Sequence, residues 1–229
     1  MTSDSLTVGM LLFPKLTQLD LTGPYEVFTR LPDCRVELIW KTLDTVRADS
    51  GIGMLPSVTF ATCPQLDIIC VPGGPGVAPL MEDDETLEFL RRVAKTAQYV
   101  TSVCTGSLVL GAAGLLKGKR ATTHWMSHDL LAAFGAQPVD ERTVRDGNVV
   151  TGGGVTAGID FALSLITELR GKDVAEEVQL SIEYDPAPPL NAGSPRVAET
   201  ALVDRMRSRG AARQQQRAEI VQRAAARLG

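Results

Sequence analysis

The chain has 229 residues, of which 44% are hydrophobic and 22% are charged, and its formal net charge is −4. This length and composition favour one α/β domain of a globular protein, and the small negative charge gives no indication of a nucleic-acid or membrane partner. Four widely spaced cysteines and only two histidines speak against a zinc site.

The beginning of the chain carries no recognisable targeting signal. Residues 1–4 lack the basic region and the apolar stretch of a signal peptide, and no apolar run reaches the length of a transmembrane helix. We therefore expect a cytoplasmic protein with free thiols.

The first predicted strand is Leu6–Phe13, an almost continuous apolar run that is typical of a strand buried on both faces. Pro24 favours the first turn of the helix that follows, with Thr22 or Gly23 as its cap. Asp20 is then expected in the loop between this strand and its helix. From local sequence alone, Asp20 is a loop residue or a helix cap.

Further strands are predicted in the first half of the chain, at Arg35–Trp40, around 45–49 and 55–60 with Gly51 and Gly53 turning between them, and at Leu66–Val71. The last of these strands leads into a glycine-rich loop, Pro72–Gly76. Such a loop can approach a ligand with bare backbone N–H groups. It lacks the Lys-Ser/Thr ending of a phosphate loop.

A cysteine follows the next predicted strand directly. Helical spacing over Glu85–Ala97 precedes an apolar run that ends at Cys104, and small residues and a helical pattern to Leu116 follow. This order predicts a strand, a sharp turn and a helix, as in a nucleophile elbow. Cys104 would then be a nucleophile whose thiolate the helix N-terminus favours. The alternative is a buried structural cysteine, the role we assign to Cys34, Cys63 and Cys70.

The second half is predicted to hold a basic turn at 117–120, a strand or strand exit at 121–125, a hairpin within 137–150, helices at Ile159–Arg170 and Asp173–Glu183, and no regular structure over Tyr184–Pro195. The tail from Arg196 is amphipathic, with its charges on a solvated face. We expect residues 1–195 to form a single domain. Residues 196–229 are expected to form a helical extension that packs on the body or on a partner subunit.

Alternating strands and helices predict a mostly parallel sheet with helices on both faces. Ligands bind such sheets outside the carboxyl ends of the strands. Asp20, the Pro72–Gly76 loop, Cys104 and the loop Gly152–Gly154 all fall at such ends. Their convergence strengthens the prediction that Cys104 is a nucleophile.

The elbow at Cys104, the Pro72–Gly76 loop and the segment Asp20–Phe28 resemble the ThiJ/PfpI superfamily, whose fold is flavodoxin-like and related to class I glutamine amidotransferase domains. More narrowly, four stretches resemble the isocyanide (isonitrile) hydratases of this superfamily: residues 101–116, 120–125, 151–154 and 186–195. The resemblance implies a homodimer without metal or organic cofactor. It also implies that water and an isocyanide, R–N≡C, combine to an N-substituted formamide.

The resemblance also implies roles for individual residues. The Cys104 thiolate would add to the isocyanide carbon and form a thioimidate, with Asp20 delivering the proton. Backbone N–H groups of Gly74 and Thr105 are candidates to stabilise the intermediate, and the Thr105 hydroxyl could bond near the thiolate. Gly153 would leave room for the elbow helix to shift. For His124 we expect a structural role, because no acyl-transfer triad is evident.

Other functions of the superfamily stay open as alternatives. Its peptidase-like and glyoxalase-like members usually carry histidine directly after the nucleophile, where this chain has Thr105. Its transcriptional regulators append a DNA-binding module, for which we expect no room before Gly229. The alternatives kept are a non-catalytic redox sensor with an oxidisable Cys104, and a glyoxalase- or deglycase-like enzyme acting on small aldehydes.

Overall fold

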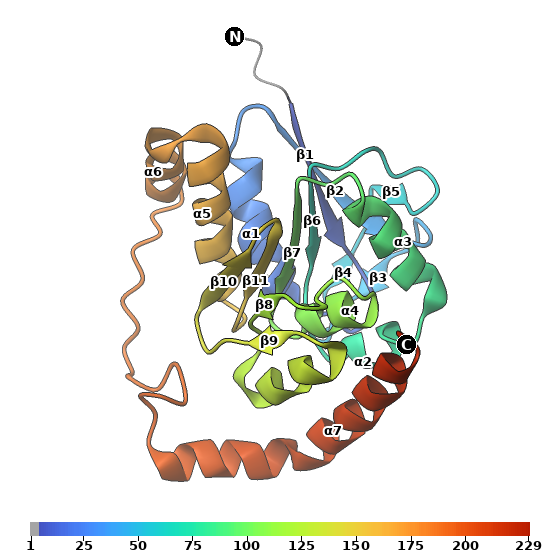
Figure 1. The fold of residues 1–229 in the computed structure, drawn as a ribbon. Helices are drawn as coiled ribbons and strands as arrows, with labels where there is room; N and C mark the ends of the chain where they lie inside the picture. The colour runs from blue at the N-terminus through green and yellow to red at the C-terminus, as the bar shows by residue number, and fades with distance from the viewer. Residues whose placement is uncertain (1–4) are drawn as a thin grey trace.

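The computed structural model describes residues 5–229; residues 1–4, which bear on the absence of a signal peptide, lie outside the described part. Seven strands form the central sheet in the order β10-β11-β7-β6-β1-β2-β5. Neighbouring strands are parallel except for the hairpin β10–β11. Helices α1 and α5 lie on one side of the sheet and α3 and α4 on the other (Figure 1). The predicted flavodoxin-like fold is confirmed.

The strands of this sheet are β1 (Leu6–Leu11), β2 (Cys34–Trp40), β5 (Val58–Thr59), β6 (Ile68–Val71), β7 (Tyr99–Val103), β10 (Thr143–Asp146) and β11 (Val149–Gly152). Two small sheets pair β3 (Val46–Arg47) with β4 (Gly53–Met54), and β8 (Arg120–Ala121) with β9 (Gln137–Pro138). The helices are α1 (Gln18–Thr29), α2 (Val77–Leu80), α3 (Asp84–Ala94), α4 (Gly106–Ala112), the 3₁₀-helix η1 (Trp125–Phe134), α5 (Ala157–Arg170), α6 (Lys172–Ser181) and α7 (Thr200–Ala226).

The central strands owe their position to their apolar sequences. Every residue of β6 and β7 is buried, as helices on both faces of a parallel sheet require. Both strands end at the same edge, where the Pro72–Gly76 loop and Cys104 follow. The sheet therefore brings two of the predicted site segments together.

The first helix begins earlier than predicted. It starts at Gln18 with Thr17 at its N-cap, so Pro24 lies inside it and Asp20 lies in its first turn instead of in a loop. Proline cannot donate a hydrogen bond to the carbonyl four residues earlier, which normally disfavours an interior position. Here tertiary packing outweighs that preference: Pro24 is buried, and a Cβ at Gly158 of α5 would lie 2.8 Å from Pro24 Cδ.

In the second half, the predicted hairpin is confirmed, with Gly147 in its turn at a φ of +63°. Residues 184–195 contain no helix or strand, as predicted. Two details differ: Gly53, expected in a turn, belongs to β4, and η1 was not predicted. Helix α7 packs along η1 and α4 of the same chain. The division of the chain at residue 196 stays a prediction.

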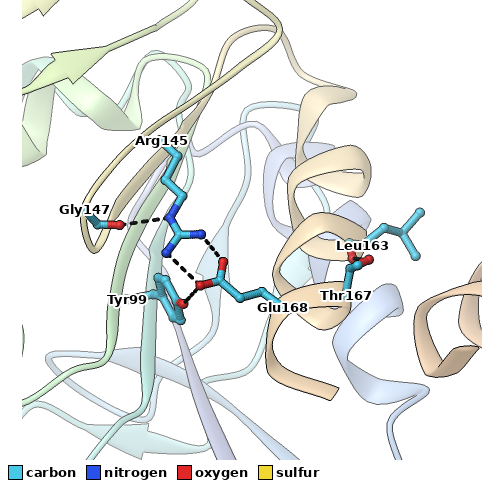
Figure 2. Close-up of polar contacts among 6 residues, drawn as sticks. All are labelled: Tyr99, Arg145, Gly147, Leu163, Thr167 and Glu168. Atoms are coloured by element: carbon cyan, nitrogen blue, oxygen red, sulfur yellow. Dashed lines mark hydrogen bonds and ion pairs between the residues drawn. The ribbon is translucent and has the colours of Figure 1, made fainter. Parts of the chain in front are cut away.

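A polar network fixes the amino end of β7, away from Cys104 (Figure 2). The Tyr99 hydroxyl donates to Glu168 Oε1 over 2.7 Å, and Arg145 Nη2 donates to the same oxygen over 2.7 Å. Arg145 Nε also donates to the Gly147 carbonyl over 3.0 Å. The network ties β7, the β10–β11 hairpin and α5 together, so its role is in the fold.

Candidate active site

Cys104 stands at the turn between β7 and α4 with a φ of +54°, a left-handed conformation that is uncommon for a residue with a side chain. Hydrogen bonds hold the turn from both sides. The Cys104 N–H donates to the Gly152 carbonyl over 2.9 Å, and its carbonyl accepts from the Thr123 hydroxyl over 2.8 Å. The strained backbone directs the side chain out of the turn, as in a nucleophile elbow.

Glycine allows the elbow to lie close to the Pro72–Gly76 loop. A Cβ at Gly106 would lie 2.0 Å from the Val71 carbonyl oxygen. At Gly73 it would lie 2.5 Å from the Thr105 nitrogen and 2.8 Å from Asp20 Oδ2. Any larger residue at either position would push α4 and the loop apart.

Asp20 is fully buried beside Cys104. Its Oδ2 accepts from the Gly73 N–H over 2.8 Å. Its Oδ1 is buried without a hydrogen-bond partner of ordinary geometry among the described residues, and the carboxyl interacts with the Cys104 side chain. Burial raises the pKa of Asp20 to about 7, although the bond from Gly73 opposes this. Near neutral pH the carboxyl is therefore present in both its acid and its base form.

Burial opposes the predicted stabilisation of the Cys104 thiolate by the helix N-terminus. Burial raises the pKa of Cys104, whose residue is only 6% exposed, and the negative charge of Asp20 raises it further. The backbone N–H of Thr105 at the sulfur acts in the opposite direction but does not outweigh burial. Cys104 therefore rests as a thiol with a proton acceptor, Asp20, next to it.

The backbone N–H groups of Gly74 and Thr105, both predicted to stabilise the intermediate, differ from each other in their contacts. The Thr105 N–H lies at the Cys104 sulfur, and the Thr105 hydroxyl accepts from the Gly74 N–H over 3.1 Å. The Gly74 N–H is thus already paired within the chain. Thr105 links the elbow to the glycine-rich loop.

Gly153 directly follows β11 and is hydrogen-bonded to the segment before β10. Its N–H donates to the Arg142 carbonyl over 2.9 Å. The atoms nearest to a Cβ added there belong to Glu141, Arg142 and Thr122, at 3.5–3.6 Å, which is ordinary contact. None of these three nearest atoms belongs to α4, and the room that Gly153 leaves for a shift of α4 stays a prediction.

A pocket of about 160 Å³ opens onto Cys104. The site residues predicted from the sequence that line it are Gly74, Cys104, Thr105 and His124. Helix α7 adds Arg213, Gln214 and Arg217, and the remaining lining residues are Thr17, Asp49, Pro75, Met126 and Val155. The two arginines give one side of the pocket a positive charge. Arg213 and Arg217 are four residues apart, which places both side chains on one face of α7. This spacing is the only signal in the sequence that could have identified them.

His124 has a capping role at the edge of this pocket. Its Nδ1 accepts from the Met126 N–H over 3.3 Å at the start of η1. Burial lowers the pKa of His124, which keeps the imidazole neutral near pH 7. These contacts agree with a structural role.

Residues 5–229 contain neither a clustered set of metal ligands nor a helix of membrane-spanning character. In this range no group of three or more His, Cys, Asp or Glu side chains is placed to hold a metal ion. None of the helices described is long and apolar enough to cross a membrane.

Comparison with known proteins gives consistent matches. The model of the DJ-1/PfpI family matches residues 7–168. An isonitrile hydratase of Pseudomonas putida is 61% identical over 224 residues, which are 98% of each chain. The crystal structure of a ThiJ/PfpI family protein from Pseudomonas syringae superposes with a TM-score of 0.92 at 43% identity, over 96% of this chain and 93% of that chain. A glutathione-independent glyoxalase of Caenorhabditis elegans, DJR-1.2, is 29% identical over 57% of this chain and 70% of its own.

Proposed function

The chain belongs to the DJ-1/PfpI family, and we propose that it hydrates isocyanides, R–N≡C, to N-substituted formamides. The observation that carries this proposal is the contact between the Cys104 thiol and the Asp20 carboxyl at the base of a small pocket. The similarity to an isonitrile hydratase along 98% of the chain supports the same activity.

In the first step we propose that the Cys104 sulfur and a proton add to the same carbon of the isocyanide. As the S–C bond forms, Asp20 accepts the thiol proton and a proton passes from Asp20 to that carbon. The product is a thioimidate, R–N=CH–S–Cys104, and the number of protons on Asp20 is unchanged. A carboxyl whose pKa lies at about 7 suits both transfers, because general acid–base catalysis works best near the operating pH.

In the second step water adds to the thioimidate carbon while the nitrogen gains a proton. The tetrahedral intermediate, R–NH–CH(OH)–S–Cys104, then loses the C–S bond, and its hydroxyl proton returns to the sulfur. N-substituted formamide and the free thiol result, with no change of oxidation state. The Thr105 N–H at the sulfur would stabilise the negative charge that develops there as the bond breaks.

The two alternative functions gain no support from the site. Redox-sensing cysteines have a low pKa and are accessible to solvent, whereas Cys104 is buried and its pKa is raised. The glyoxalase-like alternative lacks the histidine that its members usually carry after the nucleophile, where Thr105 stands.

Turnover distinguishes these functions directly. Purified protein is expected to convert n-butyl isocyanide to N-butylformamide without added nucleotide, metal or thiol, as followed by chromatography with mass detection. Consumption of methylglyoxal but not of the isocyanide would favour the glyoxalase-like function instead. Consumption of neither, together with rapid oxidation of Cys104 by peroxide, would favour the sensor.

We also propose that the protein is a cytoplasmic homodimer. Large apolar side chains are exposed in the segment before α7 and on α7 itself, among them Leu190 (77%), Val197 (51%) and Met206 (40%). A hollow of about 260 Å³ lies beside them, lined by Trp125, Leu202 and Met206 among others. Burial of these side chains against a second copy would remove apolar surface from water.

Light scattering tests the oligomeric state. We expect a mass of about twice the 24.5 kDa of one chain. Replacing Leu190 and Val197 with aspartate should shift the mass toward the monomer, because charge opposes burial of this surface. A wild-type mass of 24.5 kDa would contradict the proposal.

A further inference from the structure

Arg217 of α7 is a buried cation that has no acidic partner within residues 5–229. Its residue is 6% exposed and lines the pocket that opens onto Cys104. Its Nη1 donates to the Ser127 hydroxyl over 2.9 Å and to Gln214 Oε1 over 3.4 Å. Its Nε is buried without a partner among the described residues, and no ion pair found there includes Arg217. An unpaired buried charge is destabilising unless an anion compensates it.

The other charged groups at the pocket leave an excess of positive charge. Arg213, one turn from Arg217, lines the same pocket, and burial together with the charge of Arg213 lowers the pKa of Arg217. Asp49 is the one carboxylate that lines the pocket in the described residues, and it accepts a hydrogen bond from the Thr17 hydroxyl over 2.9 Å. Asp20 lies behind Cys104 and is partly protonated near neutral pH. Within residues 5–229, two guanidinium groups therefore line the pocket beside one carboxylate, and Arg217 also interacts electrostatically with Cys104.

The geometry of the guanidinium favours one class of anion. Its N–H groups form a planar fork that matches the two oxygens of a carboxylate. Arg217 uses Nη1 on two uncharged oxygen acceptors, which leaves other N–H groups for a ligand. The pocket of about 160 Å³ admits only a small molecule, so the anion must lie within a few bonds of the group that reacts at Cys104.

We propose that Arg217, assisted by Arg213, forms an anion subsite that binds a carboxylate on the substrate. The preferred substrates are then small isocyanides that carry a carboxylate one or two carbons from the isocyano nitrogen. The claim that the isocyano group of this substrate reacts at Cys104 rests on the proposed hydratase function. The binding of a carboxylate at Arg217 can be tested without turnover.

A matched pair of substrates isolates the effect of the substrate's carboxylate charge on kcat/KM. 2-Isocyanoacetate and 2-isocyanoacetamide have nearly the same size, and the wild type is expected to favour the carboxylate at least about tenfold in kcat/KM. Arg217→Met should bring the ratio of the two kcat/KM values close to one, and Arg217→Lys should retain part of the preference. Arg209→Met changes an exposed arginine of α7 outside the pocket and should keep the wild-type ratio.

The ratio separates recognition from other roles of Arg217. If the wild type shows no preference, or if Arg217→Met lowers both kcat/KM values in proportion, the subsite is refuted, because a folding role or an effect on Cys104 changes both substrates alike. Calorimetry with N-formylglycinate and N-formylglycinamide keeps the test independent of turnover. Binding of the carboxylate that requires Arg217 supports the subsite even if no isocyanide is consumed, and in that case the hydratase proposal alone fails. Equal binding of the two compounds refutes the subsite.

Discussion

Cys104→Ser is expected to fold like the wild type and to lose at least about 10³-fold of its isocyanide turnover. Serine has nearly the same size as cysteine, so the strained elbow and its hydrogen bonds to Gly152 and Thr123 should persist. The hydroxyl is a much weaker nucleophile toward the isocyanide carbon, and removal of a nucleophile is among the largest single losses an enzyme can show. Initial rates with n-butyl isocyanide and the thermal unfolding midpoint measure the two parts of this expectation.

The matched control is the same substitution at Cys63, whose thiol donates to the neighbouring Pro64 carbonyl over 3.3 Å and does not line the pocket. Burial raises the pKa of Cys63 to about 11, so it is also a thiol near neutral pH. Cys63→Ser should keep the wild-type rate. A Cys104→Ser enzyme that works within about twofold of the wild type would refute the role of Cys104.

Asp20→Asn is expected to lower kcat at least tenfold, because an amide can neither accept the thiol proton nor donate a proton to the isocyanide carbon. The wild-type pH profile of kcat/KM should have an inflection near the pKa of Asp20, about 7, and the variant should lack it. The amide oxygen can still accept the bond from the Gly73 N–H, so the loop should hold its position. If kcat and the pH profile are unchanged in Asp20→Asn, Asp20 does not transfer a proton and has only a structural role in the first turn of α1.

The same variant is expected to be more stable than the wild type at alkaline pH. The pKa of Asp20 is raised from 3.8 to about 7 in the folded state, so the folded protein holds this proton more tightly than the unfolded chain. The stability that Asp20 contributes is present below the unfolded pKa of 3.8 and is lost as the pH rises to about 7. Between about pH 4 and pH 8 the free energy of unfolding of the wild type should therefore fall by a few kcal/mol relative to that of Asp20→Asn. Urea unfolding of both proteins at several pH values measures this difference.

The elbow could be predicted from the sequence because its features are local. An apolar run, a cysteine and small residues follow one another directly around Cys104, and that order has few structural solutions. The start of α1 could not be predicted in this way. The helix holds Pro24 in its interior, packed against Gly158 of α5, and such a contact between residues far apart in the sequence cannot be read from local sequence.

The charge state of the site depends on burial, which the sequence does not show. A helix N-terminus alone favours the thiolate, but the depth of Cys104 and the nearby carboxyl of Asp20 reverse the shift. Arg217 was missed for a similar reason. The arginine-rich tail is predicted to be a helix with its charges on a solvated face, and only its position along η1 and α4 brings Arg213 and Arg217 into the pocket.

Mass spectrometry of the wild-type enzyme, quenched during turnover of n-butyl isocyanide in water enriched in ¹⁸O, tests the central claim most directly. We predict a peptide containing Cys104 whose mass is increased by one whole isocyanide, since the thiol proton moves to the bound carbon. We also predict that the formamide oxygen carries the ¹⁸O label. An adduct on any residue other than Cys104, or a formamide without label, would contradict hydration through a thioimidate on this cysteine.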